Sequence, residues 1–231
     1  MLSQPPWVVK GEETASKSRM NFNDLSKDYA EKNLRRRDLN VDPYLQLLQW
    51  FDEAKAVNVA ELNTMSLATA TATGKPSCRL VLLKQIDERS LIFYTNYESR
   101  KSKELTENPF AMITIFWHEQ VRQICVEGTV EKISEEESQA YFSIRSRASQ
   151  IGAWASRQDK AIPSREVLEA EFTKFEKQFE GQQEVPLPSF WGGFRLIPNR
   201  FEFWQGGGNR LHDRFHYILQ NDKWVIERLS P

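Results

Sequence analysis

Cysteine and histidine are scarce in this sequence of 231 residues, which contains two cysteines and three histidines. With no cluster of sulfur and imidazole ligands, the sequence predicts neither a metal site nor a disulfide framework. Cys78 and Cys125 lie in apolar, strand-like segments. We therefore expect both to be buried free thiols.

Net charge is also nearly absent, because 31 Lys and Arg residues oppose 32 Asp and Glu residues. The chain thus lacks the overall basic field of nucleic-acid-binding proteins, and any anion site has to be local. No apolar segment approaches the roughly 20 residues needed to cross a bilayer, and the first residues do not have the pattern of a signal peptide. We expect a cytoplasmic protein that binds neither nucleic acid nor membranes.

The residues that are present suffice for a core, since 40% are apolar and 12% are aromatic. Residues 1–33 are polar and aperiodic, which predicts a flexible N-terminal arm, and residues 34–231 are expected to form a single domain. The basic triplet Arg35–Arg37 is typical of a solvated patch, although it could also hold a phosphate or the acidic surface of a partner.

Short β-rich segments separated by turn signals dominate the chain after residue 63. Consecutive strands on short turns favour an antiparallel meander that closes into a barrel. We predict a mainly β protein with flanking helices, of α+β class, with a bend at Gly128. The expected strands cover residues 64–70, 78–84, 90–95, 110–117, 121–133, 193–196, 201–204, 214–219 and 223–229.

Flanking helices are predicted from capping residues and helical spacing. The last of them, from about residue 164 to 179, carries three phenylalanines at helical spacing, which is more typical of a core or subunit contact than of a cofactor site. The expected N-caps are Asp42 before Pro43, Ser99 before a helix that Asn108 and Pro109 end, and Ser134, which forms a capping box with Glu137.

The segment Trp204–Arg214 places two arginines and a histidine at alternate positions after three glycines. In an extended chain Arg210, His212 and Arg214 would share one face. Two permanent cations beside an imidazole suit an anionic ligand. A glycine-rich turn followed by a solvated edge strand explains the same segment equally well.

The segment Tyr94–Lys101 is the better local phosphate site. A strand ends and a helix begins there, so free backbone N–H groups face the same place as Arg100, Lys101 and the hydroxyls of Thr95 and Ser99. The same residue types are also common at exposed helix starts.

Arg79 and Lys84 stand at the two ends of an apolar strand and are five residues apart. Strict alternation sends them to opposite faces, so either one of them is solvated or the strand bends between them. Gln123, on a predicted strand, could hydrogen-bond a heteroaromatic ligand or face water. A polar helix face could line a small anion pocket, and it carries Tyr141, Arg145 and Ser149.

Motifs of nucleophilic catalysis are missing, as are the Rossmann glycine fingerprint and the P-loop. Two separated phosphate-type sites and one histidine fit a phosphorylated flavin that faces a phosphorylated substrate.

The chain closely resembles the pyridoxine/pyridoxamine 5′-phosphate oxidases over about residues 29 to 231. So many blocks in order are far more specific than any single motif. The matching blocks are Leu34–Leu39, Arg79–Lys84, Phe93–Lys101, Ser149–Trp154, Glu184–Gly193, Glu202–Gly207, Arg210–Arg214 and Glu227–Pro231.

This resemblance implies an FMN-binding split β-barrel that works as a homodimer, with FMN at the subunit interface. It also implies oxidation of pyridoxine or pyridoxamine 5′-phosphate to pyridoxal 5′-phosphate, with hydride passing from C4′ to FMN and O₂ giving hydrogen peroxide. The alternatives are a split-barrel protein that binds flavin or haem without oxidase activity, and a barrel that binds nucleic acid or protein through the basic triplet.

Residue roles follow from the matching motifs. The resemblance implies FMN contacts for Arg79, Val81, Leu82, Lys84, Tyr94, Thr95, Ser99, Arg100, Lys101, Gln123, Gln158, Trp204 and Arg214. It implies substrate contacts for Lys84, Tyr141, Arg145, Ser149, Arg210, Leu211 and His212, with Arg210 and His212 over the reacting end as the catalytic residues.

Three positions bear on how far these roles transfer. Asp159 follows Gln158 where the family often has serine, which puts an acid near the expected FMN site. The segment Ser143–Ser146 departs from the family pattern but keeps Arg145, and Tyr29 matches a tyrosine that can close over the substrate.

Overall fold

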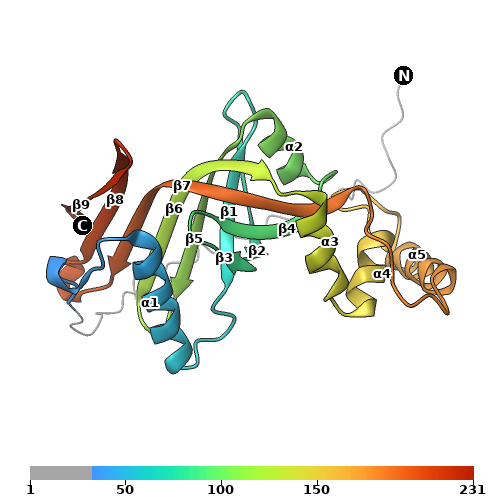
Figure 1. The fold of residues 1–231 in the computed structure, drawn as a ribbon, viewed down its shortest axis with the longest axis horizontal. Helices are drawn as coiled ribbons and strands as arrows, with labels where there is room; N and C mark the ends of the chain where they lie inside the picture. The colour runs from blue at the N-terminus through green and yellow to red at the C-terminus, as the bar shows by residue number, and fades with distance from the viewer. Residues whose placement is uncertain (1–32) are drawn as a thin grey trace, which may run out of the picture.

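The computed structural model describes residues 33–231, so the predicted N-terminal arm and Tyr29 lie outside the described residues. The predicted strands and helices occur in the expected order (Figure 1), but strand β3 and helix α4 were not predicted. The strands are β1 (Thr64–Ala70), β2 (Pro76–Leu82), β3 (Gln85–Ile86), β4 (Leu91–Asn96), β5 (Phe110–Trp117), β6 (Arg122–Lys132), β7 (Trp191–Gln205), β8 (Asp213–Gln220) and β9 (Lys223–Leu229). The helices are α1 (Pro43–Ala56), α2 (Arg100–Glu107), α3 (Glu135–Ser143), α4 (Arg147–Ala155) and α5 (Arg165–Gln178), with short 3₁₀ turns at Arg36–Asp38 and Gly208–Arg210.

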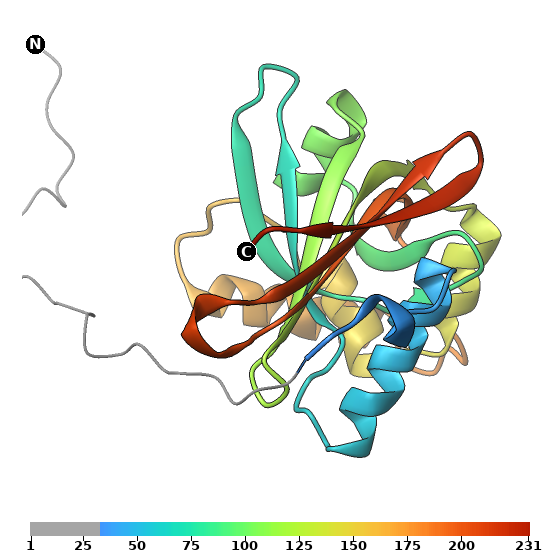
Figure 2. The same ribbon diagram turned by 90° about the vertical axis from the view of Figure 1, so that its left-hand side faces the viewer.

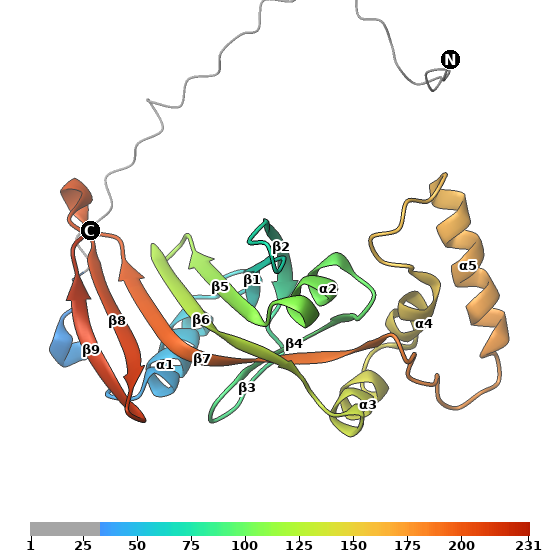
Figure 3. The same ribbon diagram turned by 90° about the horizontal axis from the view of Figure 1, so that it is seen from above.

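The strands form one antiparallel sheet in the order β2-β1-β5-β6-β7-β4-β3, and β8 and β9 extend it from β7. The sheet curls into a half-barrel with helices around it (Figure 2). Helices α3 to α5 lie at one end and the β8–β9 hairpin at the other (Figure 3). This arrangement confirms the predicted mainly β split barrel with flanking helices.

Strand β7 organises the sheet because it pairs along its whole length. Its first half pairs with β4, its second half with β8, and both halves pair with β6. The prediction of two separate strands, at 193–196 and 201–204, is therefore wrong. The error came from Pro198, which normally argues against a central strand but is tolerated at a bulge.

The bend predicted at Gly128 coincides with a β-bulge between β6 and β7, opposite Pro198. The β6–β7 register shifts between Glu127 and Gly128, and Gly128 pairs with Pro198. A Cβ atom on Gly128 would overlap the Ile197 carbonyl. Glycine is thus required here by the close approach of two backbones.

The helix starts agree with the capping predictions at Asp42 and Ser134. The Asp42 carboxylate accepts a hydrogen bond from the Tyr44 backbone N–H at 2.7 Å, and Ser134 forms the capping box with Glu137. The helix predicted after Ser134 was expected to carry Tyr141 and Arg145 on one face. It ends instead at Ser143, and Arg145 lies in the short connection between α3 and α4.

Two apolar clusters hold the structure together. The larger one fills the barrel beneath α1, where Trp50 packs edge-to-face on Phe203 at 5.1 Å. The smaller one joins α3, α4 and α5, and it contains buried Phe179 with Phe172 and Phe175 packed against it. The phenylalanine stripe of α5 is therefore part of a core, as predicted.

The cysteine prediction is right at one position and wrong at the other. Cys125 is buried, and burial raises the pKa of its thiol. Cys78 is exposed, because β2 is an edge strand with one open face. Within residues 33–231, none of the helices is both long and apolar enough to cross a membrane.

Gly128→Ala tests the close contact between β6 and β7. Because the added methyl meets backbone rather than a flexible side chain, we expect the free energy of unfolding to fall by about 1–3 kcal/mol. Gly152→Ala is the matched control, since its Cβ meets no atom within 4 Å and helix α4 should gain up to about 1 kcal/mol. Equal stabilities of the two variants in urea unfolding would contradict the packing argument.

Candidate active site

A cavity of about 1200 Å³ lies between the start of α2 and the α3–α4 connection. Strand β2 and the end of β4 also contribute to its wall, and β7 contributes its first residue, Trp191. Most of the predicted site residues line this one cavity: Arg79, Val81, Leu82, Lys84, Tyr94, Thr95, Arg100, Lys101, Tyr141, Arg145, Ser149 and Gln158.

The position at which β2 ends explains how Arg79 and Lys84 come to face the same cavity. The strand stops at Leu82, and the chain turns through Leu83 and Lys84 into β3. Both cations therefore line the same cavity although they are five residues apart. Of the two alternatives, the structure has the bend: β2 ends before Lys84, and the chain turns there.

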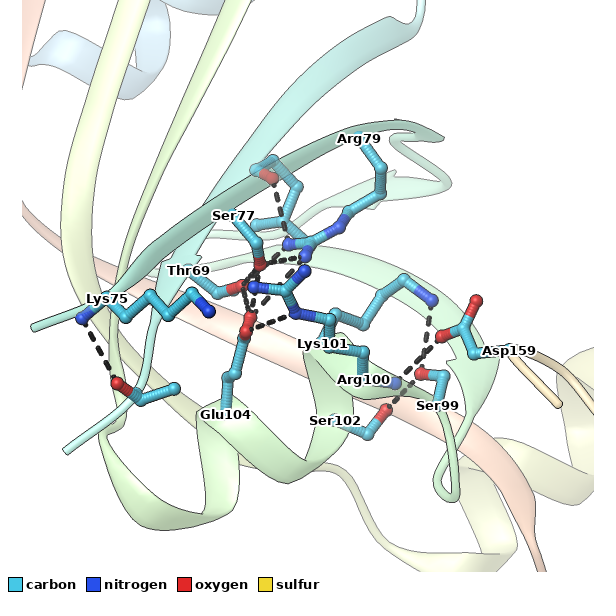
Figure 4. Close-up of polar contacts among 12 residues, drawn as sticks. Thr69, Lys75, Ser77, Arg79, Ser99, Arg100, Lys101, Ser102, Glu104 and Asp159 are labelled. Carbon is cyan, nitrogen blue, oxygen red and sulfur yellow. Dashed lines mark hydrogen bonds and ion pairs between the residues drawn. The ribbon is translucent and has the colours of Figure 1, made fainter. Parts of the chain in front are cut away.

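A buried carboxylate, Glu104, organises the cations on the β2 side of the cavity (Figure 4). Its side chain accepts hydrogen bonds from the Thr69 hydroxyl at 2.5 Å, from the Ser77 hydroxyl, and from Arg100 Nε at 2.8 Å. Arg79 Nη2 lies 3.4 Å from the same carboxylate. Burial alone would raise the pKa of Glu104, but these hydrogen bonds and the Arg100 charge lower it to about 2.

Lys101 occupies the start of α2 with its ammonium group buried. Its Nζ donates to Thr95 Oγ1, Ser99 Oγ and Gln158 Oε1 at 3.1–3.2 Å. Burial lowers the pKa of Lys101, and the nearby Asp159 charge acts in the opposite direction. Ser99 thus lies under the cavity wall and positions a cation instead of capping the helix with its side chain.

The opposite end of the cavity is aromatic and cationic. Tyr94 stacks on Tyr141 with 3.8 Å between ring centroids, and Trp191 continues the stack at 5.5 Å from Tyr94. The Arg145 guanidinium lies over the Trp191 ring at 4.7 Å. Its Nη1 atom is buried without a hydrogen-bond partner among the described residues, so this end offers an unused donor to a ligand.

Helix α4 begins beside Arg145. Its N-cap Ser146 and first-turn Ser149 both line the cavity, and their hydroxyls lie 2.8 Å apart. The cavity therefore has a helix N-terminus and permanent cations at each of two ends. Both features attract anions.

Besides the buried Ser99, which does not line the cavity, six predicted residues lie outside it: Gln123, Trp204, Arg210, Leu211, His212 and Arg214. They belong to β6, the end of β7, the following 3₁₀ turn and β8, near the end of the molecule away from α4 and α5 (Figure 1). The fold places these six residues near one another but away from the cavity of their own chain.

Of the two alternatives for this segment, the structure has the glycine-rich turn, and of residues 210–214 only Asp213 and Arg214 belong to a strand. Arg210 ends a 3₁₀ turn with a positive φ of 60°. His212 Nδ1 accepts a hydrogen bond from the Gly207 backbone N–H at 3.1 Å, and its ring lies 4.7 Å from that of Trp204. Arg214 donates to Glu202 at 2.8 Å. The triple glycine therefore makes a folded turn that presents Arg210 and Leu211 to solvent.

Sequence reasoning missed Glu104 and Trp191. The four-residue spacing from Arg100 to Glu104 was a usable signal, because such pairs face each other on a helix. The hydrogen bonds from Thr69 and Ser77 depend on the β1–β2 register, which places these two residues opposite each other. Trp191 lies in a block that was recognised only for its sequence match.

Glu104→Gln tests the buried carboxylate. A folded-state pKa of about 2, below the usual 4.5, contributes about 3 kcal/mol that is present above pH 4.5 and is lost as the pH falls toward 2. We expect the free energy of unfolding at pH 7 to drop by about this amount in the variant, with a weaker acid dependence than in the unmodified protein. Glu107→Gln, exposed on the same helix, is the control, and identical acid unfolding of the two variants would refute the role of Glu104.

Comparison with known proteins gives matches over the whole described fold. A family model described as Pyridoxamine 5′-phosphate oxidase matches residues 51–179, and one described as Pyridoxine 5′-phosphate oxidase C-terminal dimerisation region matches residues 191–231. The pyridoxine/pyridoxamine 5′-phosphate oxidase of Rippkaea orientalis is 49% identical and covers 92% of this chain and 100% of its own. That of Nostoc punctiforme is 50% identical, with coverages of 90% and 97%.

Solved structures agree with these matches. PhzG from Burkholderia lata, in complex with tetrahydrophenazine-1-carboxylic acid, has a TM-score of 0.81 at 31% identity, covering 87% of this chain and 99% of its own. An FMN-binding protein from Nostoc punctiforme, related to pyridoxamine 5′-phosphate oxidase, has a TM-score of 0.66 at 18% identity, with coverages of 82% and 97%, and supports the fold alone. As the ordered sequence blocks predicted, the chain belongs to the pyridoxine/pyridoxamine 5′-phosphate oxidase family.

Proposed function

We propose that this protein is an FMN-dependent oxidase that converts pyridoxine or pyridoxamine 5′-phosphate to pyridoxal 5′-phosphate. Bound FMN supplies the redox chemistry, taking hydride from substrate C4′ and passing electrons to O₂ to give hydrogen peroxide. The observation that carries the proposal is one cavity with two anion-attracting ends, which suits a phosphorylated cofactor and a phosphorylated substrate. The relatives at about half identity are oxidases of these two substrates by name.

The α2 end fits the FMN phosphate. It combines the N-terminus of α2 with buried Lys101 and with Arg79 and Arg100, whose guanidinium groups Glu104 holds in place. The volume of about 1200 Å³ exceeds that of a typical small-ligand pocket, about 300–1000 Å³. There is room for a flavin and a second ring together.

The α4 end fits the substrate phosphate. Arg145 Nη1 is a buried donor without a partner in the described chain, and a phosphate oxygen would satisfy it. Tyr141 and Ser149 come from α3 and α4 at this end, Lys84 lines the same cavity, and these side chains can bind the remaining oxygens. The role of these four residues is to hold the substrate so that its C4′ carbon faces the flavin.

The residues outside the cavity are proposed to act on the second subunit of a homodimer. The matched C-terminal region is described in the family as a dimerisation region. Leu80, Phe110 and Phe116 are at least half exposed on β2 and β5, an apolar face that a second subunit would cover. In that arrangement Arg210 and His212 reach the substrate, and Gln123, Trp204 and Arg214 reach the flavin, in the partner's cavity.

Substrate oxidation is the direct test of the function. The protein with FMN should release hydrogen peroxide in air with pyridoxine 5′-phosphate and far less with unphosphorylated pyridoxine. Because phosphate contacts are made about equally in the ground and transition states, Arg145→Met should raise KM for the phosphorylated substrate by roughly 30-fold or more with a smaller loss of kcat. Equal KM values for the variant and the unmodified protein would exclude Arg145 as the phosphate ligand. No peroxide from either phosphorylated substrate would exclude the function.

The two-subunit site is tested with a hybrid dimer. Lys101→Met removes a cation from the cavity, and Arg210→Ala removes the proposed partner contribution, so each homodimer should be nearly inactive. A hybrid purified with two different tags has one site carrying both changes and one intact site, and we expect about half of the unmodified activity per dimer. If Arg210 acts within its own chain, both sites of the hybrid carry one defect and the hybrid is as inactive as its parents.

A further inference from the structure

The turn between α4 and α5 inserts two side chains into the cavity end that is proposed to bind the FMN phosphate. A hydrogen bond from Lys160 N to Arg157 O at 3.0 Å closes the turn around Gln158 and Asp159. Both central residues line the cavity. Asp159 has a φ of 66°, a left-handed conformation that aspartate and asparagine adopt more readily than most residues.

These side chains make the contacts that an anion would make there. Asp159 Oδ2 accepts a hydrogen bond at 2.8 Å from the backbone N–H of Arg100, the first residue of α2 (Figure 4). Gln158 Oε1 accepts from Lys101 Nζ and Thr95 Oγ1, each at 3.2 Å. The N-cap residue Ser99 does not bond the helix start with its own side chain. The carboxylate that caps α2 thus comes from a turn 59 residues away in sequence.

The two carboxylates near α2 differ in what holds them. Glu104 is 2% exposed and is fixed by hydroxyl and guanidinium groups on several sides. Asp159 is exposed, and its bond to Arg100 N is a single contact with backbone. Asp159 can therefore leave the helix start and remain in water, without leaving a charge buried and unpaired.

We propose that Asp159 is a displaceable internal ligand, whose carboxylate occupies the start of α2 until the phosphate of the flavin takes its place. This inference rests on the proposed FMN site. The phosphate and Asp159 would compete for the Arg100 N–H group, and their negative charges repel each other, so the phosphate enters only as Asp159 moves out. Asp159 also borders a second hollow of about 320 Å³ that Lys160 helps to line, which gives the displaced carboxylate room and a counter-charge.

Asp159 therefore lowers the affinity for FMN while it stabilises the cofactor-free protein. A fixed helix cap would have the opposite effect on binding, because a cap that orders α2 helps any ligand that binds the helix start. Comparing FMN with riboflavin distinguishes the two roles, because riboflavin has the same ring system but no phosphate.

The test compares Asp159→Asn with the unmodified protein, using titrations of the cofactor-free forms followed by flavin fluorescence. Asparagine keeps the size and tolerates the positive φ but removes the charge. We expect FMN to bind about tenfold more tightly to the variant and riboflavin to change less than about twofold. The cofactor-free variant should melt at a lower temperature and gain more from saturating FMN than the unmodified protein does.

Glu98→Gln is the matched control. It removes one negative charge two residues before α2, from a side chain that borders the second hollow and not the cavity, so its FMN affinity should stay within about twofold of the unmodified value. Asp159→Gly, which suits the same φ, should repeat the tightening without any side chain.

Unchanged or weaker FMN binding in both Asp159 variants would overturn the proposal and make Asp159 a structural cap. Equal tightening of FMN and riboflavin would also overturn it, because the effect would not depend on the phosphate. Failure of the unmodified protein to bind FMN at all would instead refute the proposed function, so the two failures are distinguishable.

Discussion

Strand β7 is the constraint on which the rest of the structure depends. It pairs with β6 from Phe194 to Gln205, with β4 over its first part and with β8 over its last part. Trp191 at its start lines the cavity, whereas Trp204 near its end packs beside His212. At roughly 3.3 Å per residue these two positions lie about 40 Å apart along the strand. One continuous strand thus separates the two groups of predicted site residues, and the proposed second subunit would bring them together.

The same half-barrel concentrates positive charge around the cavity, and the chain has to stabilise that charge without a ligand. Arg79 and Arg100 are held by Glu104, which the β1–β2 hydroxyl groups Thr69 and Ser77 keep ionised. Lys101 is surrounded by hydroxyl and amide oxygens instead. The donors of the proposed phosphate site are consequently held in place by the protein itself, which would reduce the entropy cost of binding a phosphate.

How far the sequence predicted this arrangement depends on the range of each interaction. Local signals located the capping boxes, the α5 phenylalanine stripe, the bend at Gly128 and the helix start at Ser99, because each depends on neighbours within a few residues. The ordered blocks predicted the family and, with it, the split barrel. Contacts between strands, including those of Glu104, could not be predicted, because they depend on the register in which the strands pair. Alternation also failed at Arg210, where three glycines let the chain fold into a turn and not extend.

The contrast between Glu104 and Asp159 shows how burial decides the role of a charge. Both carboxylates contact α2, and both balance part of the positive charge around the cavity. Protonating or moving Glu104 would leave the Arg79 and Arg100 guanidinium groups without their counter-ion, and Arg79 is only 20% exposed, so Glu104 behaves as a permanent part of the site. Asp159 contacts the same helix from an exposed turn, so replacing its hydrogen bond to the protein with one to water costs little free energy. In the proposed site, one fixed and one exchangeable carboxylate would together balance the cations of the cavity and still let a phosphate bind.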